Sequence, residues 1–154
     1  YTQVLWLDAI EHRWVEEVGT MNIFFVFRDE IVTPPLSGTI LPGVTRDSVI
    51  TICRRWGLKI SERMISIEEV METARTGELK EIFGTGTAAV VSPVGVLSYK
   101  GKEVIVGRNR TGDLSLRLYT YLTRLQHGEE DDPFGWVERI DGQSIDELAA
   151  WNGD

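Results

Sequence analysis

The sequence contains few of the residues that form disulfides, metal sites or catalytic triads. Its 154 residues include a single cysteine, Cys53, so no disulfide can form within the chain. The two histidines, His12 and His127, share no ligand spacing with each other or with a carboxylate cluster. Neither histidine pairs by spacing with a serine nucleophile. We therefore predict no metal site and find no support for a hydrolase triad.

Positive charge and long apolar runs are also scarce. Lys and Arg number 16 against 24 Asp and Glu, which leaves a net charge of −8. An acidic surface repels nucleic acid and anionic membranes, so we expect neither as a partner. No apolar run approaches the roughly 18 residues of a membrane span, and no signal-peptide pattern opens the sequence. Cys53 lies at helical spacing among apolar residues, so we expect it to be buried as a small hydrophobic side chain. A chain with one buried cysteine suits a reducing cytoplasm.

Length and composition fit one domain. The chain is long enough to bury a core, and 42% apolar with 26% charged residues is ordinary for a globular protein. We assign residues 1–140 to this domain and residues 141–154 to a polar C-terminal tail. A strand-like segment, Gln3–Leu7, begins almost at the first residue, so we expect the chain to be the C-terminal part of a longer protein.

Periodic patterns predict strands mixed with covering helices. Helices are expected at 46–56, 67–75 and 114–126, with Thr45 and Ser66 as N-caps and Gly57 and Gly77 after the first two helices. Short apolar segments predict strands at 4–8, 14–17, 22–27, 31–33, 58–65, 80–83, 88–91, 94–99 and 103–106. This pattern indicates an α/β or α+β domain with a barrel-like mixed sheet, and periodicity does not decide between the two classes.

Three short loops rich in Gly and Thr carry the candidate chemistry, and the first contains a carboxylate. Glu17 ends a predicted strand just before Gly19 and Thr20. Strand alternation places Glu16 and Glu17 on opposite faces, so one of them can point inward. An inward Glu17 could be a general acid or base, a metal ligand or the partner of a protonated ring nitrogen. A surface charge at a strand end is the commoner role.

The other two loops have backbone N–H groups that suit an anion. Gly43 precedes Val44 and Thr45 at the start of a predicted helix, where the amides and the helix dipole favour negative charge. The segment Gly84–Ala89 has two hydroxyls and closely spaced amides. Taken singly, a capped helix and a tight turn are the commoner explanations. Together, the three loops are the kind of cradle that a phosphorylated heterocycle needs.

In this order, the loops resemble the C-terminal domain of branched-chain amino acid aminotransferases, which are pyridoxal-phosphate enzymes of fold type IV. Each similar segment is weak alone, whereas the ordered set, which reaches from Gln3 to about Trp136, is specific. The segments are Gln3–Leu7, Glu17–Asn22 (Glu-Val-Gly-Thr-Met-Asn), Thr33–Gly38, Leu41–Arg46, Phe83–Ala88, Pro93–Val94 and Leu122–Gly128.

The resemblance implies a role for each matching residue. Glu17 would pair with the protonated pyridine nitrogen of pyridoxal 5'-phosphate, and Leu41 would pack against the ring. The phosphate would be held by the amides of Val44 and Thr45 and by the Thr87 hydroxyl, and Gly43 and Gly86 would be further cofactor-binding residues. The substrate carboxylate would be held by Thr20 and Ala88. The family transfers an amino group between leucine, isoleucine or valine and 2-oxoglutarate. It is homodimeric, so the resemblance implies a homodimeric, cytoplasmic whole enzyme of the bacterial type.

The sequence departs from the family pattern at two places, which limits how far the family's properties apply to this chain. Ala89 and Ser92 stand where some animal members carry a Cys-x-x-Cys pair, so we expect no thiol switch. The family's Schiff-base lysine lies in a stretch before residue 1. None of the lysines of this chain matches it; they are Lys59, Lys80, Lys100 and Lys102. The small N-terminal domain, which supplies a phosphate-binding Arg, is absent as well. We therefore predict no catalytic residue in this chain and no activity of the fragment alone.

Two alternatives stay open from the sequence. D-amino-acid aminotransferases and aminodeoxychorismate lyases share the scaffold but catalyse different reactions, although the segment Glu17–Asn22 favours the branched-chain group. The other alternative is a lysine-less module that binds a phosphorylated ligand without turning it over.

Overall fold

The computed structural model describes residues 1–138, which form strands mixed with helices as the sequence predicts. The chain divides into two compact units, of which the first spans Tyr1–Thr120 and the second begins at Tyr121. The expected boundary at residue 140 and the polar tail 141–154 lie outside the described residues. Within residues 1–138, no helix combines the length and the apolar composition needed to cross a membrane.

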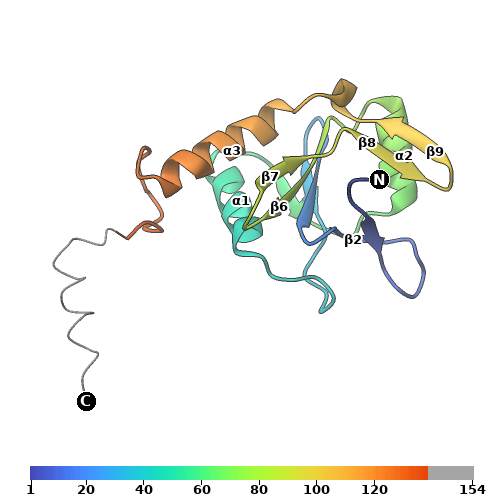
Figure 1. Cartoon of the computed structure of the whole chain (residues 1–154), viewed down its shortest axis with the longest axis horizontal. Coiled ribbons are helices and arrows are strands. Elements are labelled where there is room, and N and C mark those ends of the chain that lie inside the picture. Colours follow the sequence, from blue (N-terminus) through green and yellow to red (C-terminus); the bar gives the residue numbers. More distant parts are fainter. Residues whose placement is uncertain (139–154) are drawn as a thin grey trace, which may run out of the picture. The chain divides into compact units, whose positions relative to one another are not determined.

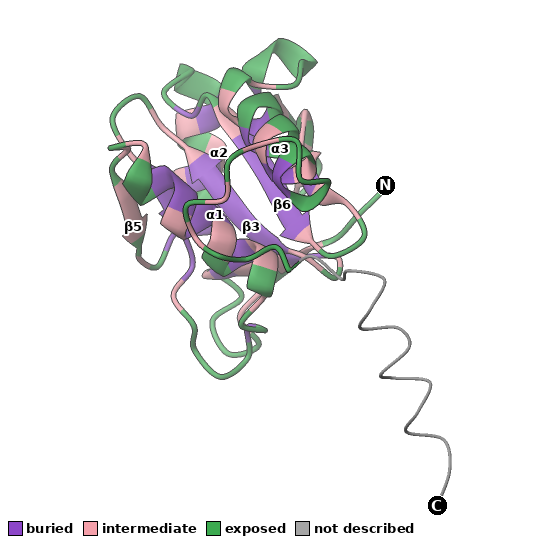
Figure 2. Ribbon diagram, turned by 90° about the vertical axis from the view of Figure 1, so that its left-hand side faces the viewer, coloured by how far each residue is buried: buried purple, intermediate pink, exposed green. Residues whose placement is uncertain are grey.

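A mixed sheet of five strands lies at the centre of the first unit, in the order β5-β4-β3-β6-β7. Its strands are β3 (Asn22–Val26), β4 (Ile31–Thr33), β5 (Ile60–Glu62), β6 (Glu81–Gly86) and β7 (Val90–Pro93). Strands β4 and β5 are parallel because helix α1 (Val44–Arg55) forms the crossover between them, and the other neighbours are antiparallel. Figure 2 shows β3 and β6 as the buried centre of this sheet.

Two hairpins and two further helices complete the described fold. One hairpin pairs β1 (Leu5–Leu7) with β2 (Val15–Val18), and the other pairs β8 (Val96–Tyr99) with β9 (Lys102–Ile105). Helix α2 covers Ile67–Thr76, a 3₁₀ turn covers Gly107–Asn109, and helix α3 covers Asp113–Gln126. Figure 1 shows α1 beside β6, and α2 beside β9.

The pairing register divides the side chains of the central sheet between two faces. Asn22 lies opposite Thr85 and Phe24 opposite Phe83, so these four side chains share a face, with the two phenyl rings stacked at 5.1 Å. The alternate residues, Ile23, Phe25 and Ile82, belong to a core cluster that includes buried residues of α2 and β2. The buried residues of α1 lie outside that cluster, and α1 contacts β6. The site described below is on the α1 face.

Helix α1 carries the buried cysteine and a buried arginine. Burial raises the pKa of the Cys53 thiol to about 12, so this side chain packs as a small hydrophobe. Arg46 Nη2 donates to the carbonyl of Pro34 at 2.9 Å and to Glu62 Oε2 at 2.8 Å. Chiefly through this hydrogen bond, Arg46 holds the pKa of Glu62 below its usual range. Arg46 thus connects the first turn of α1 to the residue after β4 and to the last residue of β5.

Helix boundaries follow the sequence except at the start of α1. The Oγ atom of Ser66 accepts a hydrogen bond from the Glu69 amide at 3.1 Å, as the capping box predicts, and Gly77 ends α2 with a left-handed φ of +76°. The expectation that Thr45 caps α1 is wrong, because Gly43 has the extended backbone of the N-cap and Thr45 lies within the first turn. The segment predicted as a strand at 58–65 pairs only over Ile60–Glu62, where β4 is available.

The first turn of α3 is held by a side chain from the central sheet. Glu81 accepts hydrogen bonds from the amides of Leu114 at 3.0 Å and Ser115 at 2.9 Å, and from the Ser115 hydroxyl at 2.8 Å. A carboxylate at this position satisfies free amides and opposes the positive end of the helix dipole. Glu81 precedes Leu114 by 33 residues, so this long-range contact fixes where α3 begins.

The substitution Glu81→Ala should therefore lower the free energy of unfolding by about 1–2 kcal/mol, because three donors lose a charged acceptor. Glu81→Gln, which keeps one carbonyl acceptor, should lose less. Urea denaturation of the two variants measures the difference. An unchanged midpoint in Glu81→Ala would show that α3 does not depend on this carboxylate.

The turn between β1 and β2 is organised by Asp8. Its carboxylate accepts hydrogen bonds from the backbone amides of Ile10, Glu11, Arg13 and Trp14 at 2.6–3.2 Å. Because these bonds favour the charged form, they hold the pKa of Asp8 well below its usual value of 3.8, with the Trp14 amide contributing most.

A folded-state pKa below the unfolded value means that Asp8 stabilises the fold above pH 3.8 and loses this contribution as the pH falls further. We expect the urea midpoint to drop between pH 7 and about pH 3, and to drop less in Asp8→Asn, which cannot titrate. Equal pH dependence in both proteins would contradict the role of Asp8.

Candidate cofactor site

The three predicted loops meet at one end of the central sheet. Asn22 begins β3 and lies opposite Thr85 near the end of β6. The tight turn at Gly19 and Thr20 comes just before β3, closed by hydrogen bonds between Val18 and Met21 at 2.9 Å. The loop leading into α1 reaches the same end, because the Asn22 side chain donates to the Leu41 carbonyl at 2.8 Å.

Glu17 is held by two donors on one of its carboxylate oxygens. Its Oε1 atom accepts from the Leu41 amide at 3.2 Å and from Asn22 Nδ2 at 3.1 Å. Its Oε2 atom accepts no hydrogen bond from residues 1–138. The carboxylate is therefore oriented by the protein and keeps one oxygen available to a ligand.

The expectation that Glu16 and Glu17 point to opposite faces is wrong. Leu5 pairs with Val18 and Leu7 with Val15, so β2 has one residue more than β1 between these pairs, which is a β-bulge. The bulge lets Val15 and Val18 both be buried while both glutamates reach the loop before α1. Glu16 Oε1 accepts from the Thr39 hydroxyl at 2.7 Å, in the same loop that Glu17 contacts.

Helix α1 begins without a side-chain cap. Its N-cap residue is Gly43, which has no side chain that could accept a hydrogen bond from the helix amides, and Val44 is 83% exposed. Among the described residues, no side chain caps the first amides of α1. Free amides at the positive end of a helix of 12 residues suit a phosphate. The positions of Gly43, Val44 and Thr45 are therefore compatible with the predicted phosphate contacts.

The segment 84–89 differs from the loop that we expected. Strand β6 continues through Gly86, because Gly86 pairs with Val90 of β7, and a turn begins at Thr87. Gly84 and Gly86 lie against the side chain of Met21, which precedes β3. Thr87 and Ala88 are exposed at this turn. Thr20 is close by, since a Cβ on Gly86 would lie 4.0 Å from the Thr20 carbonyl oxygen.

A buried hydroxyl without a partner lies at the same end of the sheet. Thr85 is 1% exposed, and its Oγ1 atom has no hydrogen-bond partner within the described part of the chain. Such a group usually has a reason, because an unsatisfied buried hydroxyl costs about 1–3 kcal/mol. Together with the free oxygen of Glu17 and the uncapped start of α1, it fits a ligand with a protonated ring nitrogen and a phosphate.

The lysines lie away from these groups. Lys59 and Lys80 are at the far end of the sheet, where their backbones bond to Ile31 and Val26. Lys100 and Lys102 flank the turn of the β8–β9 hairpin. The described residues also contain no group of three or more His, Cys, Asp or Glu side chains that could hold a metal ion.

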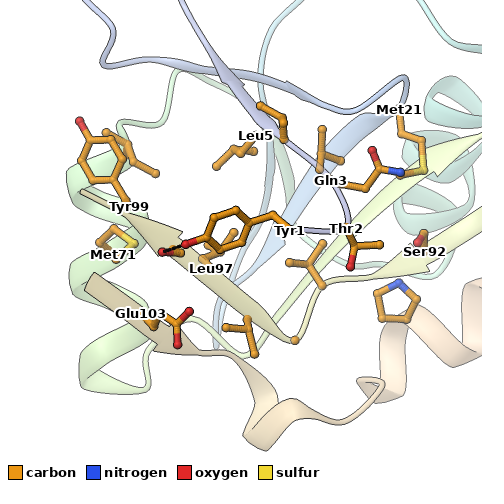
Figure 3. A pocket seen from close by; sticks show the side chains of 18 of the residues that line it. Tyr1, Thr2, Gln3, Leu5, Met21, Met71, Ser92, Leu97, Tyr99 and Glu103 are labelled. Atoms are coloured by element: carbon orange, nitrogen blue, oxygen red, sulfur yellow. Dashed lines mark hydrogen bonds between the residues drawn. The ribbon is translucent and has the colours of Figure 1, made fainter. Parts of the chain in front are cut away.

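A pocket of about 580 Å³ lies next to the site but is not part of it. Figure 3 shows it between Tyr1, Met71 and Leu97, and the Tyr1 hydroxyl is 3.2 Å from Ser98 Oγ. Met21 lines this pocket and also contacts Gly84, so Met21 separates the pocket from β6. None of the predicted site residues lines it.

Sequence reasoning missed Asn22 as a member of the site. One signal was present: Asn22 is a polar residue at the start of an otherwise apolar run, Asn22–Phe27, and a buried amide there needs partners. Asn22 brings together Glu17, Leu41 and Gly43, three of the predicted residues. Thr20, Gly86, Thr87 and Ala88 lie at the same sheet end without a direct bond to that group.

Comparison with known proteins identifies the family of this chain. The amino-transferase class IV family matches residues 1–97, so the chain belongs to this family. It is 57% identical over 140 residues to branched-chain-amino-acid transaminase 1 of Bacillus subtilis (strain 168), covering 91% of this chain and 39% of that protein. A probable branched-chain-amino-acid aminotransferase of Streptomyces coelicolor is 43% identical, covering 90% of this chain and 38% of that protein. The chain thus spans about two fifths of the length of these relatives.

Solved structures confirm the fold. The branched-chain amino acid aminotransferase of Escherichia coli is 30% identical with a TM-score of 0.74, over 92% of this chain and 44% of that one. A second such aminotransferase, solved with pyridoxamine 5'-phosphate, is 28% identical with a TM-score of 0.75, over 91% of this chain and 42% of that one. The predicted resemblance to branched-chain aminotransferases and the mixed α/β fold of fold type IV are both confirmed. Family and neighbours together imply a pyridoxal-phosphate cofactor.

The close packing around Gly43 should make the fold sensitive to a side chain at this position. A Cβ on Gly43 would lie 2.2 Å from Asn22 Oδ1, so Gly43→Ala should lower the free energy of unfolding by about 1–3 kcal/mol. Gly86→Ala should cost less, because its Cβ would meet the flexible Met21 side chain at 3.1 Å. Thermal or urea denaturation ranks the two variants. A larger loss in Gly86→Ala would contradict this packing.

Proposed function

We propose that this chain forms the cofactor-binding part of a branched-chain amino acid aminotransferase, which transfers an amino group between leucine, isoleucine or valine and 2-oxoglutarate. The observation that carries the proposal is the hydrogen-bonded link between the Glu17 carboxylate and the loop that leads into the uncapped start of α1. The identity of 57% to a Bacillus subtilis branched-chain transaminase supports the substrate class.

We propose one role for each group of the site. Glu17 Oε2 accepts the N–H of the cofactor ring and keeps the proton on that nitrogen. Leu41, 69% exposed beside Glu17, covers one ring face and excludes water. When bound, pyridoxal 5'-phosphate supplies an electron-withdrawing ring that takes up the electron pair left at the substrate Cα. Glu17 makes the ring a better acceptor by holding its proton.

The phosphate and the substrate carboxylate are bound by neighbouring donors. The amides of Val44 and Thr45 donate to the phosphate at the positive end of α1, where Gly43 leaves them uncapped, and the exposed Thr87 hydroxyl adds a donor from the turn after Gly86. Thr20 and the Ala88 amide, both exposed at the same sheet end, hold the substrate carboxylate.

The whole enzyme needs more than this chain. We propose that the Schiff-base lysine and the small N-terminal domain belong to the part of the protein that precedes Tyr1, and that the whole enzyme is a cytoplasmic homodimer. The chain alone then binds and orients but has no base for the proton transfer at the substrate Cα. Lys59 and Lys80 support this division, because their backbone bonds lie at the sheet end opposite Asn22.

A chimera tests the proposal directly. The chain would be joined to the part of the Bacillus subtilis transaminase that lies outside the matched region, and assayed with pyridoxal 5'-phosphate and 2-oxoglutarate. We expect glutamate formation with L-leucine from the chimera and none from the chain alone. Activity only with D-alanine or aminodeoxychorismate would instead assign one of the other fold type IV reactions. Cofactor binding by the chimera without any turnover would favour a binding module.

Glu17 and Glu16 form a matched pair within the chimera. Glu17→Gln should lower kcat by about 10²-fold or more, because a neutral amide no longer holds the proton on the ring nitrogen. Glu16→Gln should change kcat little, since Glu16 contacts Thr39 and not the cofactor site. Steady-state kinetics with leucine and 2-oxoglutarate measure both. Equal losses in the two variants would remove Glu17 from the proposed role.

A further inference from the structure

Asn22 is a buried polar side chain at the centre of the candidate cofactor site. It is 4% exposed and begins β3, between the glutamate of β2 and the loop before α1. Burying an amide is costly unless its donors and acceptor find partners, so the partners of Asn22 show what its burial achieves.

Both partners of the Asn22 Nδ2 atom belong to the site. One is the Leu41 carbonyl at 2.8 Å, and the other is Glu17 Oε1 at 3.1 Å. The Leu41 amide donates to the same Oε1 atom at 3.2 Å. The three hydrogen bonds close a ring in which Leu41 is held through both its N–H and its carbonyl. The carboxylate therefore cannot turn without disturbing the chain just before the N-cap of α1.

The other end of the Asn22 amide faces the helix start. Its Oδ1 atom would lie 2.2 Å from a Cβ on Gly43. The φ of Gly43 is −67°, which any residue adopts, so its conformation does not require glycine. The close approach of Asn22 does require it. Asn22 thus lies against the carboxylate on one side and against the N-cap of α1 on the other.

We infer that Asn22 is the positioning residue of the cofactor site, whose amide fixes the Glu17 carboxylate and the first turn of α1 relative to each other. This inference rests on the proposed function, in which the carboxylate meets the ring nitrogen and the helix start meets the phosphate. Because Asn22 and Leu41 both bind Oε1, the ring proton is directed to Oε2. The distance between the Glu17 carboxylate and the start of α1 is thereby fixed. This fixed distance matches the distance between the ring nitrogen and the phosphate of a rigid ligand.

A mutational cycle on the chain itself tests the coupling without any cofactor. The variants are Asn22→Ala, Gly43→Ala and the double variant, each unfolded in urea. Gly43→Ala should raise the unfolding equilibrium constant about tenfold in the wild-type background and about twofold or less in Asn22→Ala, because the obstructing Oδ1 atom is gone. Additive effects would overturn the inference.

A ligand titration in the chimera tests the positioning role. The probe is pyridoxine 5'-phosphate, which has no aldehyde and cannot bond to a lysine, so its binding reports non-covalent contacts only. Its ultraviolet spectrum shows whether the ring nitrogen is protonated. Asn22→Ala should weaken binding about tenfold and lower by about one unit the pH at which the bound ring loses its proton.

Ser115→Ala is the matched control. Ser115 is 1% exposed and donates at 2.8 Å to Glu81 at the other end of the same sheet, so its loss also removes a buried hydrogen bond to a carboxylate. It should leave the titration of the ligand unchanged. If the wild-type chimera does not bind the probe, the proposed function fails and the inference fails with it. If the wild type binds and Asn22→Ala titrates like Ser115→Ala, the inference alone is overturned.

Discussion

The arrangement of the site depends on how the peptide of Leu41 is held. Its amide donates to Glu17 of β2 and its carbonyl accepts from Asn22 of β3. Two strands therefore hold a single residue of the loop before α1 by hydrogen bonds. The far side of that loop is fixed by Arg46, which donates to the carbonyl of Pro34. With both ends held, the helix begins where its free amides face the same sheet end as the carboxylate.

The polar groups of this sheet end are unlike the rest of the core. On the α1 face, the stacked rings of Phe24 and Phe83 give way to Asn22 and Thr85 at the last register pair. The Asn22 amide nitrogen has two partners, whereas Thr85 Oγ1 has none among the described residues, at a cost of about 1–3 kcal/mol. A fold that tolerates such a cost at its proposed ligand site is less stable there than packing alone would allow, which is common where binding is selected over stability.

Sequence patterns predicted the elements well but not the contacts between them. The capping box at Ser66 and the turn glycine Gly77 are local signals, and local signals set helix ends. The bulge at Glu16 and Glu17 depends on which residues of β1 pair with β2, a relation between strands that no single segment encodes. The continuation of β6 through Gly86 likewise depends on pairing with Val90 of another strand, β7. The loops were thus recognisable, whereas the residue that joins them, Asn22, became evident only from the fold.

The groups proposed to bind the cofactor and two of the lysines lie at opposite ends of the central sheet. Orienting the proposed cofactor needs fixed donors and acceptors, and the candidate groups for this, at the bulge, the helix start and the Asn22 amide, all lie within the first compact unit. The proposed proton transfer at the substrate Cα also needs a base, and Lys59 and Lys80 are anchored by backbone bonds at the opposite end of the sheet. No side-chain rotation brings a group across the length of a strand such as β3 or β6, roughly 15–20 Å. This distance agrees with our proposal that the Schiff-base lysine belongs to another part of the whole enzyme.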